Sequence, residues 1–210
     1  MTNVLVIGGS GYIGSALVSR LASSHVQTTN CDLNWFGGPI PHLQQDYRSL
    51  SRAELSQYSH IVLLAAHSSM AMCAGNWSSS WRNNVVNFAD LVGKLNKEQT
   101  LIYASSGSVY GNGGLDRQEH MSLAAAQIEY DQQKQVIEQI ALGAECQTVG
   151  LRFGTLSGFN PHARSDLMLN AMTISAYTSS KISCYNGQNH RSILGINAVS
   201  YTHLRAHETL

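Results

Sequence analysis

Short apolar runs alternate along the chain with longer stretches in which apolar residues recur every three or four positions. The short runs predict strands, because a strand that is apolar throughout is typical of a sheet covered on both faces. We expect strands at residues 4–7, 26–32, 61–65, 101–104 and 148–153. The periodic stretches predict helices, most clearly at residues 12–22, 81–97 and 124–142. This alternation predicts an α/β protein with a doubly wound parallel sheet.

The alternation fades after about Gly158, where asparagine, serine, histidine and arginine become frequent. We therefore predict a main domain at residues 1–158 and a partial, smaller C-terminal lobe at residues 159–198.

Composition narrows the class of partner. The chain has 210 residues, which is enough for one domain with a substantial core and an appendage. Charged residues make up only 12%, against a typical fraction of about 25%, and 13 basic residues balance 13 acidic ones. A neutral chain without a basic cluster is poorly suited to follow a phosphate backbone, so no nucleic acid partner is expected.

The sequence also carries no signal for export, membrane insertion or metal binding. The N-terminus lacks a basic leader, and no stretch approaches the roughly 18 apolar residues of a membrane span. We therefore expect a cytoplasmic protein with no membrane partner. The four cysteines lie far apart without a Cys-x-x-Cys pair, so neither a zinc site nor a disulfide framework is predicted, and no metal is expected.

A glycine turn joins the first expected strand to the first expected helix. Gly8, Gly11 and Gly14 stand where a chain without Cβ atoms turns sharply and lets a pyrophosphate approach the helix N-terminus. Asp32 ends the next expected strand, near the spacing at which an acid binds an adenosine ribose. The alternative is that these glycines only allow close helix packing. No lysine or arginine lies between Asp32 and Arg48, which favours NAD over NADP.

Hydroxyl groups and a tyrosine–lysine pair follow. The serine-rich residues 105–111 come after the fourth expected strand, at the edge where open α/β sheets bind ligands. Tyr130 and Lys134 lie four residues apart, hence on one helix face. A tyrosine with its ordinary pKa near 10 is a poor base at neutral pH, and an adjacent ammonium stabilises the phenolate. The alternative interpretation of this pair is a solvated helix face.

Together these residues resemble the short-chain dehydrogenase/reductase superfamily, in its extended branch of NAD-dependent nucleotide-sugar epimerases and dehydratases, over residues 3 to about 197. The resemblance implies a Rossmann fold, bound NAD and a nucleotide-sugar substrate. It also implies a homodimer of the full-length protein, because the family commonly pairs the helices expected at residues 81–97 and 124–142 across a twofold axis.

The resemblance also assigns site residues. The expected cofactor-binding residues are Gly8, Gly11, Tyr12, Ile13, Gly14, Asp32, Asp46, Ala65, Ala66, Asn84, Tyr130 and Lys134. The expected catalytic residues are Ser106, Tyr130 and Lys134, and the expected substrate-binding residues are Ser106, Ser108, Asn170 and Arg191. In the implied roles, Tyr130 takes the proton of the sugar hydroxyl and Ser106 hydrogen-bonds the same oxygen. Lys134 lowers the pKa of Tyr130 and holds the nicotinamide ribose.

The segment after Ser106 discriminates within the family. Sugar dehydratases and several decarboxylases of the family carry an acidic residue just after the catalytic hydroxyl, whereas this chain has Gly107 and Ser108. We therefore predict oxidation and reduction at a sugar carbon through a transient ketone, with epimerisation as the net result. The alternatives are a sugar-nucleotide dehydrogenase, reductase or dehydratase, or a protein that senses a dinucleotide without turnover. The intact set of Ser106, Tyr130 and Lys134 argues against the sensor.

The final residues depart from the family pattern. Extended members of the family continue well past this point, and residues 199–210 resemble translated adapter read-through at the ends of assembled environmental sequences. We expect a non-native tail at residues 199–210, a longer natural protein, and a sugar pocket that lacks part of its wall. The alternative is a genuine short, polar C-terminal helix.

Overall fold

The computed structural model describes residues 2–35, 37–38, 40–111, 118–121, 123, 125–185, 187–188 and 190–199. Residue 124, the expected start of a helix, and residues 200–210 of the expected tail lie outside the described residues. Within the described chain, no helix is long and apolar enough to cross a membrane.

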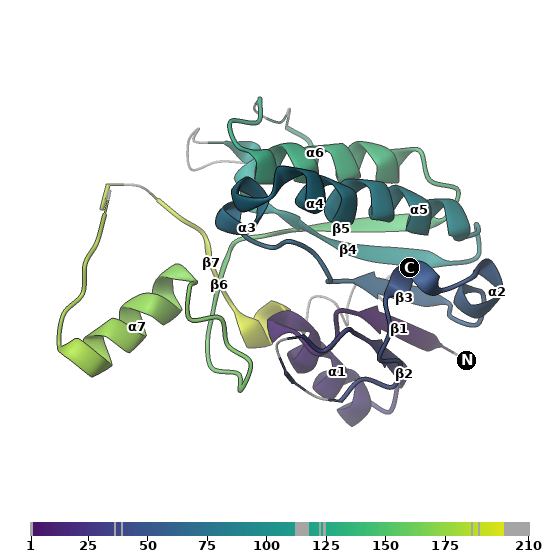
Figure 1. Ribbon diagram of the computed structural model, residues 1–210, viewed down its shortest axis with the longest axis horizontal. Coiled ribbons are helices and arrows are strands. Elements are labelled where there is room, and N and C mark those ends of the chain that lie inside the picture. Colours follow the sequence, from purple (N-terminus) through teal and green to yellow (C-terminus); the bar gives the residue numbers. More distant parts are fainter. Residues whose placement is uncertain are drawn as a thin grey trace.

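Five parallel strands form the main sheet (Figure 1). They are β1 (Asn3–Ile7), β2 (Gln27–Cys31), β3 (His60–Leu63), β4 (Thr100–Ser106) and β5 (Gln147–Phe153), in the order β2-β1-β3-β4-β5. Every pairing is parallel, with Val4 opposite both Thr28 and His60. All five strands overlap the ranges expected from the apolar runs, and the parallel α/β fold is confirmed.

The strand order reverses between β1 and β3, so the loops that follow these two strands diverge. In such a sheet, ligands bind at the carboxyl edge next to the reversal. A single residue, Leu43, forms a parallel bridge with Cys31 on the outer edge of β2. This bridge stands in the position of a sixth, rudimentary strand and gives the sheet the order of a dinucleotide-binding Rossmann fold.

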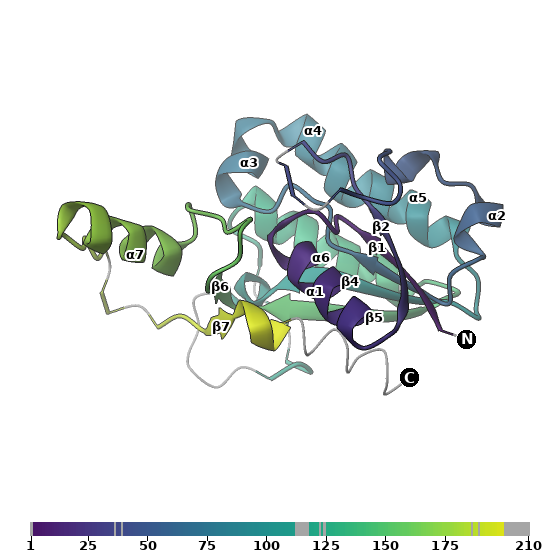
Figure 2. The same cartoon turned by 90° about the horizontal axis from the view of Figure 1, so that it is seen from below.

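The central strands β1, β3 and β4 are mostly apolar, and their two faces pack into two different cores, whereas β2 (QTTNC) and β5 (QTVGLRF) at the edges of the sheet carry polar residues. Alternate residues of β1 divide between these cores, since side chains of a strand point to opposite faces in turn. Val4 and Val6 pack with Leu17 and Leu21 of α1 (Tyr12–Ser23). Leu5 and Ile7 belong to the larger core, which contains residues of α5 (Asn87–Lys94) and α6 (Glu129–Leu142). Figures 1 and 2 show α1 and the α5–α6 pair on opposite sides of the sheet.

The helix expected at residues 81–97 differs from the structure. It begins as α4 (Trp77–Trp81), passes through a π-helical turn at Arg82–Val86 and ends with α5 at Lys94, because Leu95 has extended backbone angles. The π turn inserts one residue into the helix, and buried Asn84, whose side chain bonds with partners described below, lies within it. Short helices that apolar periodicity did not single out are α2 (Arg52–Leu55) and α3 (Met70–Gly75), with 3₁₀ turns at Tyr47–Ser49 and Gly107–Tyr110.

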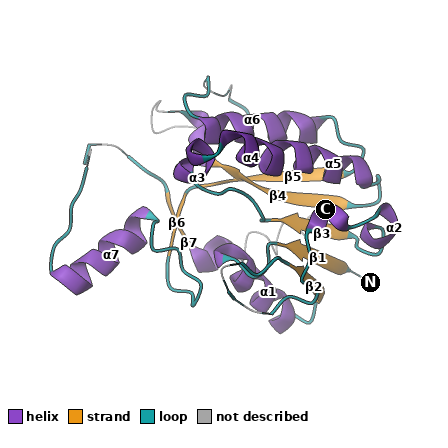
Figure 3. Cartoon of the chain, in the orientation of Figure 1, coloured by secondary structure: helices purple, strands orange, loops and turns teal. Residues whose placement is uncertain are grey.

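A smaller unit follows β5. It contains β6 (Thr155–Ser157), which pairs in parallel with β7 (Ile193–Gly195), and α7 (Met168–Ser179). Figures 2 and 3 show α7 standing away from the main sheet, and none of its residues is buried. The unit is attached to α1 by the Tyr12 hydroxyl, which donates to Gly158 O at 2.8 Å, and by Asn160, whose Nδ2 donates to Ser15 Oγ at 3.0 Å. The domain boundary at residue 158 stays a prediction.

Candidate active site

The turn after β1 packs tightly against its neighbours. Gly8 has a φ of +88°, and a Cβ atom there would lie 2.5 Å from the backbone nitrogen of Ala65, just after β3. A Cβ atom at Gly14 would lie 2.1 Å from the carbonyl oxygen of Gly8. These two glycines are therefore required by the packing of the turn itself, as the alternative interpretation of the motif holds.

Gly11 is different. A Cβ atom there would meet a single atom, Gly8 O at 3.4 Å, and the φ of −76° is open to any residue. Gly11 is also the N-cap of α1, where no side chain caps the helix and no acidic residue occupies the first turn. Backbone N–H groups of a first turn lack partners within the helix and favour anions. The absent Cβ thus leaves space for a phosphate group at this N-terminus, and the turn fits a dinucleotide.

Asp32 lies directly after β2, beside the glycine turn. Its Oδ2 accepts a hydrogen bond from the backbone nitrogen of Ser10 at 3.0 Å, and its Oδ1 accepts one from that of Asn34 at 2.7 Å. A carboxylate has further lone pairs for ribose hydroxyls. Among the described residues, the buried amide oxygens of Asn30 and Asn34 have no hydrogen-bond partner. Unpaired acceptors at this turn also fit a hydroxyl-bearing ligand.

Two other expected cofactor residues, Asp46 and Tyr12, form hydrogen bonds within the chain. The Asp46 carboxylate caps the first 3₁₀ turn and pairs with Arg48, whose Nε donates at 2.8 Å, and this pairing lowers the pKa of Asp46. Tyr12 and Ile13 open α1, with the Tyr12 hydroxyl bonded to Gly158 as described.

The carboxyl end of β4 presents the expected catalytic serine. Ser106 is the last residue of β4, and its Oγ accepts a hydrogen bond from the backbone nitrogen of Ser108 at 3.2 Å, which caps the turn Gly107–Tyr110. Ser106 also hydrogen-bonds with the hydroxyl of Tyr130 on α6. The structure therefore brings together two residues that are 24 positions apart in the sequence.

Lys134 completes this group one helical turn later. Its Nζ lies 5.6 Å from the centroid of the Tyr130 ring and donates to the carbonyl oxygen of Ala104 at 2.6 Å. The side chain is buried, and burial lowers the pKa of Lys134 to about 8. At neutral pH the amine still carries its proton for most of the time.

The pKa of Tyr130 is raised in the chain alone. Burial raises it, as do the nearby Cys73 and Asp131, while the hydrogen bond to Ser106 and the charge of Arg164 lower it. Lys134 was expected to lower this pKa, but its ammonium lies over the ring and bonds to Ala104. Lowering by Lys134 stays a prediction for the state in which the cationic nicotinamide is bound as well.

The side chain of Asn84 joins the segment after β3 to helix α6. It is buried in the π turn, where its Oδ1 accepts from His67 N at 2.8 Å and its Nδ2 donates to His67 O at 3.0 Å. The same Nδ2 also donates to Gln133 on α6 at 2.7 Å. Ala65 and Ala66 directly precede His67, so Asn84 fixes the expected cofactor-lining segment to the catalytic helix. A cavity of about 20 Å³, lined by both alanines, Asn84 and Lys134, has room for one water molecule.

An ion pair not foreseen from the sequence lies beneath the catalytic residues. Glu138, one turn after Lys134, accepts from Arg152 Nη2 at 2.7 Å and from the Ser105 hydroxyl at 2.5 Å. Burial alone would raise the pKa of Glu138, but the bonds to Arg152 and Ser105 outweigh it and lower that pKa. Arg152 also donates to the hydroxyl of Tyr110 at 2.8 Å. The only sequence signal was a charged residue on the inner face of the helix.

The expected substrate residues divide into two groups. Ser108 joins the catalytic set, because its Oγ lies 2.8 Å from Ser106 Oγ. Asn170 bonds within its own unit, accepting from Gly158 N at 3.2 Å and donating to Arg164 O at 3.0 Å. Arg191 is exposed and lies two residues before the start of β7.

Arg164 was missed. Its guanidinium pairs with Asp166 and donates to the Ser68 hydroxyl at 2.7 Å, and its charge acts on Tyr130. It therefore places a cation from the smaller unit close to the catalytic tyrosine. No motif in the sequence pointed to this approach.

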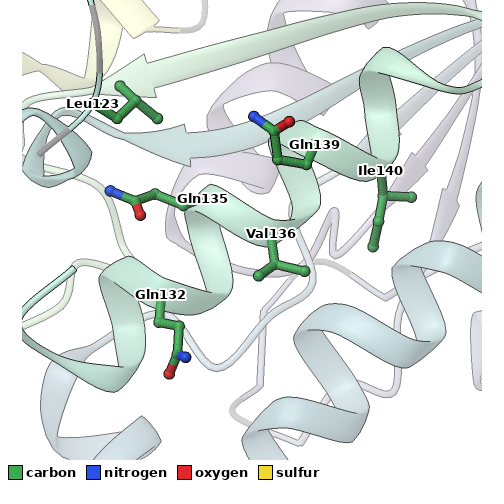
Figure 4. Close-up of a pocket in the computed structure, with 6 residues that line it drawn as sticks. All are labelled: Leu123, Gln132, Gln135, Val136, Gln139 and Ile140. Atoms are coloured by element: carbon green, nitrogen blue, oxygen red, sulfur yellow. The ribbon is translucent and has the colours of Figure 1, made fainter. Parts of the chain in front are cut away.

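A separate hollow of about 600 Å³ lies on the other face of α6 (Figure 4). Its lining residues are Leu123, Gln132, Gln135, Val136, Gln139 and Ile140. Tyr130, Lys134 and Glu138 stand on a different face of the helix, so this hollow is not part of the reaction site.

Comparisons with known proteins identify the family and related folds. The family model described as the NAD dependent epimerase/dehydratase family matches residues 4–209. A search of curated protein sequences found no match. Among solved structures, MoeE5 in complex with UDP-glucuronic acid and NAD is 25% identical, with a TM-score of 0.83 over 99% of this chain and 72% of that one.

Two further structures share the fold at lower identity. TunA, described as an NAD dependent NDP-hexosamine 5,6-dehydratase involved in tunicamycin biosynthesis, has a TM-score of 0.87 at 21% identity, over 99% of this chain and 72% of that one. UDP-glucuronic acid 4-epimerase from Bacillus cereus, in complex with UDP-glucuronic acid and NAD, has a TM-score of 0.85 at 20% identity, over 99% of this chain and 74% of that one.

Proposed function

Because the chain belongs to the NAD-dependent epimerase/dehydratase family, we propose that it oxidises one hydroxyl of a nucleotide sugar and reduces the resulting ketone from the opposite face. Epimerisation is then the net result. The observation that carries this proposal is the meeting of Ser106, Tyr130 and Lys134 at the carboxyl edge of β4. The complex of MoeE5 with a UDP-sugar and NAD, at 25% identity, supports the choice of substrate class.

When bound at this edge, NAD would supply the hydride chemistry, as acceptor of the hydride from the sugar carbon and then as its donor. Gly11 and the first turn of α1, with Tyr12 and Ile13, would hold its pyrophosphate. Asp32 would accept hydrogen bonds from the adenosine ribose. Gly8 and Gly14 shape the turn, Asp46 would lie at the adenine, and Ala65 and Ala66 would line the nicotinamide side. Asn84 contributes by fixing that last segment through its bonds to His67.

In the proposed mechanism, Tyr130 Oη takes the proton of the sugar hydroxyl and later returns it to the ketone oxygen. Ser106 hydrogen-bonds the same oxygen and fixes its position between the two hydroxyl groups. The protonated amine of Lys134 binds the nicotinamide ribose and adds positive charge beside the Tyr130 ring, which favours the phenolate. Ser108, Asn170 and Arg191 would contact the nucleotide sugar, with Asn170 exchanging one of its present backbone bonds for it.

Dehydration is a second candidate. Epimerisation was preferred because Gly107 and Ser108 stand where family dehydratases carry an acid. However, the Ser108 hydroxyl donates to the carboxylate of Asp131 at 2.5 Å. An acidic group is therefore present beside Ser106, although it comes from α6 and not from the turn after β4.

The homodimer, the cytoplasmic location and the domain division at residue 158 remain proposals. The dimer would pair the outer faces of α5 and α6 with their copies across a twofold axis, which is an isologous contact.

Liquid chromatography that separates the sugar epimers, followed by mass spectrometry, can distinguish the proposed reactions from one another and from unreacted substrate. The chain loaded with NAD is incubated separately with UDP-glucose and UDP-glucuronic acid, each deuterated at sugar carbon 4. Epimerisation predicts a product of unchanged mass that keeps its deuterium, because the hydride returns to the carbon from which it came. A product lighter by one water indicates dehydration, and accumulating NADH indicates a dehydrogenase. Binding of NAD without conversion of either sugar would contradict the proposal and favour a dinucleotide sensor.

A further inference from the structure

A buried glutamine on α6 stands between the two expected catalytic residues of that helix, and no role above uses it. Gln133 is 0% exposed although its side chain ends in a polar amide. A buried amide is costly unless its groups find partners. Here Nε2 of Gln133 donates to Ser80 Oγ at 2.9 Å, and Oε1 accepts from Asn84 Nδ2 at 2.7 Å. Gln133 therefore bonds with both α4 and the π turn.

The backbone of His67 fixes the direction of these bonds. Its N–H can only donate, so Asn84 receives it with Oδ1 and turns its amide nitrogen to Gln133. Gln133 must then offer its oxygen to Asn84 and its nitrogen to Ser80. The hydroxyl of Ser80 donates its hydrogen to backbone carbonyl groups, at 3.0 Å to that of Trp77. The position therefore requires a side chain that accepts at one point and donates at another.

The acceptor end of Gln133 has no equal substitute nearby. Asn84 Nδ2 carries two hydrogens, one for His67 O at 3.0 Å and one for Gln133 Oε1. Without Gln133, the second hydrogen would be left with the sulfur of Cys73, a weak acceptor at 3.8 Å. Loss of the glutamine amide should therefore loosen Asn84 and the backbone of His67 that Asn84 holds.

We propose that Gln133 is a positioning residue that holds residues 65–67 against α6 and so sets where the nicotinamide lies relative to Lys134. The inference rests on the proposed binding of NAD at this edge of the sheet. Asn84 carries the contact, because it bonds with the N–H and the C=O of His67 and with Gln133 on the helix. Gln133 directly precedes Lys134, so the anchor and the buried amine share one turn of α6.

Two ligands separate this role from a general loss of structure. NAD and ADP-ribose share the adenosine, the diphosphate and the second ribose, and only NAD carries the nicotinamide. If residues 65–67 are no longer held, the binding of NAD must also restore their position, which weakens it. ADP-ribose lacks the group that these residues would line, so its affinity should be nearly unchanged. The ratio of the two dissociation constants therefore reports the nicotinamide side alone.

The full chain offers matched variants. Gln133→Met keeps the length of the side chain but removes both hydrogen-bonding ends. Gln132→Met makes the same exchange at the neighbouring, exposed glutamine and is the control. Ser80→Ala is a milder second variant, because it removes the partner of Gln133 Nε2 but leaves the acceptor of Asn84 in place.

We expect Gln133→Met to raise the dissociation constant of NAD by about tenfold in isothermal titration, as for a buried donor that loses its partner. The dissociation constant of ADP-ribose should change by less than about twofold. Ser80→Ala should act in the same direction to a smaller extent, and Gln132→Met should change neither affinity.

Hydrogen exchange gives a second measurement that needs no ligand. The amide hydrogen of His67 is bonded to Asn84 Oδ1, so its exchange rate reports how firmly Asn84 is held. NMR on chain labelled with nitrogen-15 should show faster exchange of this amide in Gln133→Met and in Ser80→Ala. Gln132→Met should exchange it at the rate of the unchanged chain.

The inference is overturned if NAD affinity in Gln133→Met is unchanged or falls no more than that of ADP-ribose. In the second case Gln133 would only support the fold. An unchanged exchange rate of the His67 amide would overturn it as well, and Ser80→Ala decides on the same results if Gln133→Met does not fold. None of these measurements requires turnover, so the inference can fail while the proposed function holds. The proposed function fails separately, if Tyr130→Phe keeps its turnover.

Discussion

Lys134 lies over the ring of Tyr130, with its Nζ 5.6 Å from the ring centroid. A cation over a ring is attracted by the ring face, and here it also donates to Ala104 O. The amine is therefore anchored to the end of β4 on one side and to the catalytic ring on the other. Both contacts keep the amine of Lys134 buried, and this burial lowers the pKa of Lys134 to about 8.

The first prediction concerns stability and pH. The pKa of Lys134 falls from 10.5 to about 8 on folding, so between these pH values the unfolded chain binds a proton that the folded chain lacks. The free energy of unfolding therefore rises with pH through that window. Below about pH 8 the folded chain bears the full destabilisation that comes from burying the protonated amine. Lys134→Met removes the penalty.

Urea unfolding of Lys134→Met and of the unchanged chain checks this sign. The free energy of unfolding of the variant minus that of the unchanged chain should be larger at about pH 7 than at about pH 10. Using the difference cancels the opposite pH effect of Cys31, whose pKa burial raises to about 11. A relative stability that does not vary with pH would contradict the prediction.

A second prediction tests the ion pair beneath the site. Glu138→Gln leaves the Arg152 guanidinium without its charged partner and should lower the free energy of unfolding by about 2–3 kcal/mol. This value lies toward the low end for a buried pair, because about a fifth of the Arg152 side chain is exposed. Glu145→Gln, at an exposed position near the end of the same helix, should change stability by less than about 0.5 kcal/mol. Equal changes in the free energy of unfolding for the two substitutions would show that the Glu138–Arg152 pair does not stabilise the fold.

The third prediction separates the glycines of the turn. Gly14→Ala places a Cβ atom 2.1 Å from Gly8 O and should destabilise the fold, which a lower melting temperature would report. Gly11→Ala meets only one atom at 3.4 Å and should leave the melting temperature nearly unchanged. If the space at Gly11 holds a phosphate, the same change should weaken NAD binding by at least about tenfold in isothermal titration. Full NAD affinity in a folded Gly11→Ala chain would remove the pyrophosphate from this position.

The fourth prediction concerns the choice of dinucleotide. Asp32 has both carboxylate oxygens directed at backbone amides beside the turn, where a 2′-phosphate would meet its charge. NAD should therefore bind more tightly than NADP, and Asp32→Ala should narrow the difference. Isothermal titration with both dinucleotides measures it. Equal affinities in the unchanged chain would refute the assignment of Asp32 to the ribose.

The centre of the sheet could be predicted from the sequence because β1, β3 and most of β4 are buried on both faces and appear as short apolar runs. The edge strand β2 (QTTNC) carries no such run, and its prediction depended on its place in the alternation of strands and helices. Spacing alone placed Tyr130 and Lys134 on one helix face and Ser106 at a strand end, and the resemblance to the family implied that the three residues act together. α7 and the β6–β7 pair were not predicted, because no residue of α7 is buried and these strands are three residues long. Without a buried face, a segment carries no periodic pattern.

Contacts between loops account for the rest of what was missed. The bond between Ser108 and Asp131 depends on how the turn after β4 faces the first turn of α6, across 23 positions of sequence. Arg164 reaches Ser68 across 96 positions, and the side chain of Asn84 bonds with the backbone of His67 across 17 positions. Each contact joins polar residues that are common in loops, so the residue types alone gave no signal.

The most direct test of the central claim is the turnover of Tyr130→Phe in the full chain loaded with NAD, with UDP-glucose or UDP-glucuronic acid as substrate. Phenylalanine keeps the ring beneath Lys134 but removes the group that takes the sugar proton. Turnover should fall by about 10²–10⁴-fold, as for the loss of a general base, while the dissociation constant of NAD changes little. Tyr177→Phe, at an exposed tyrosine of α7, should keep its turnover. Near-normal turnover of Tyr130→Phe would contradict the account, because Tyr130 would then be a packing residue of α6 and not the acid and base of the reaction.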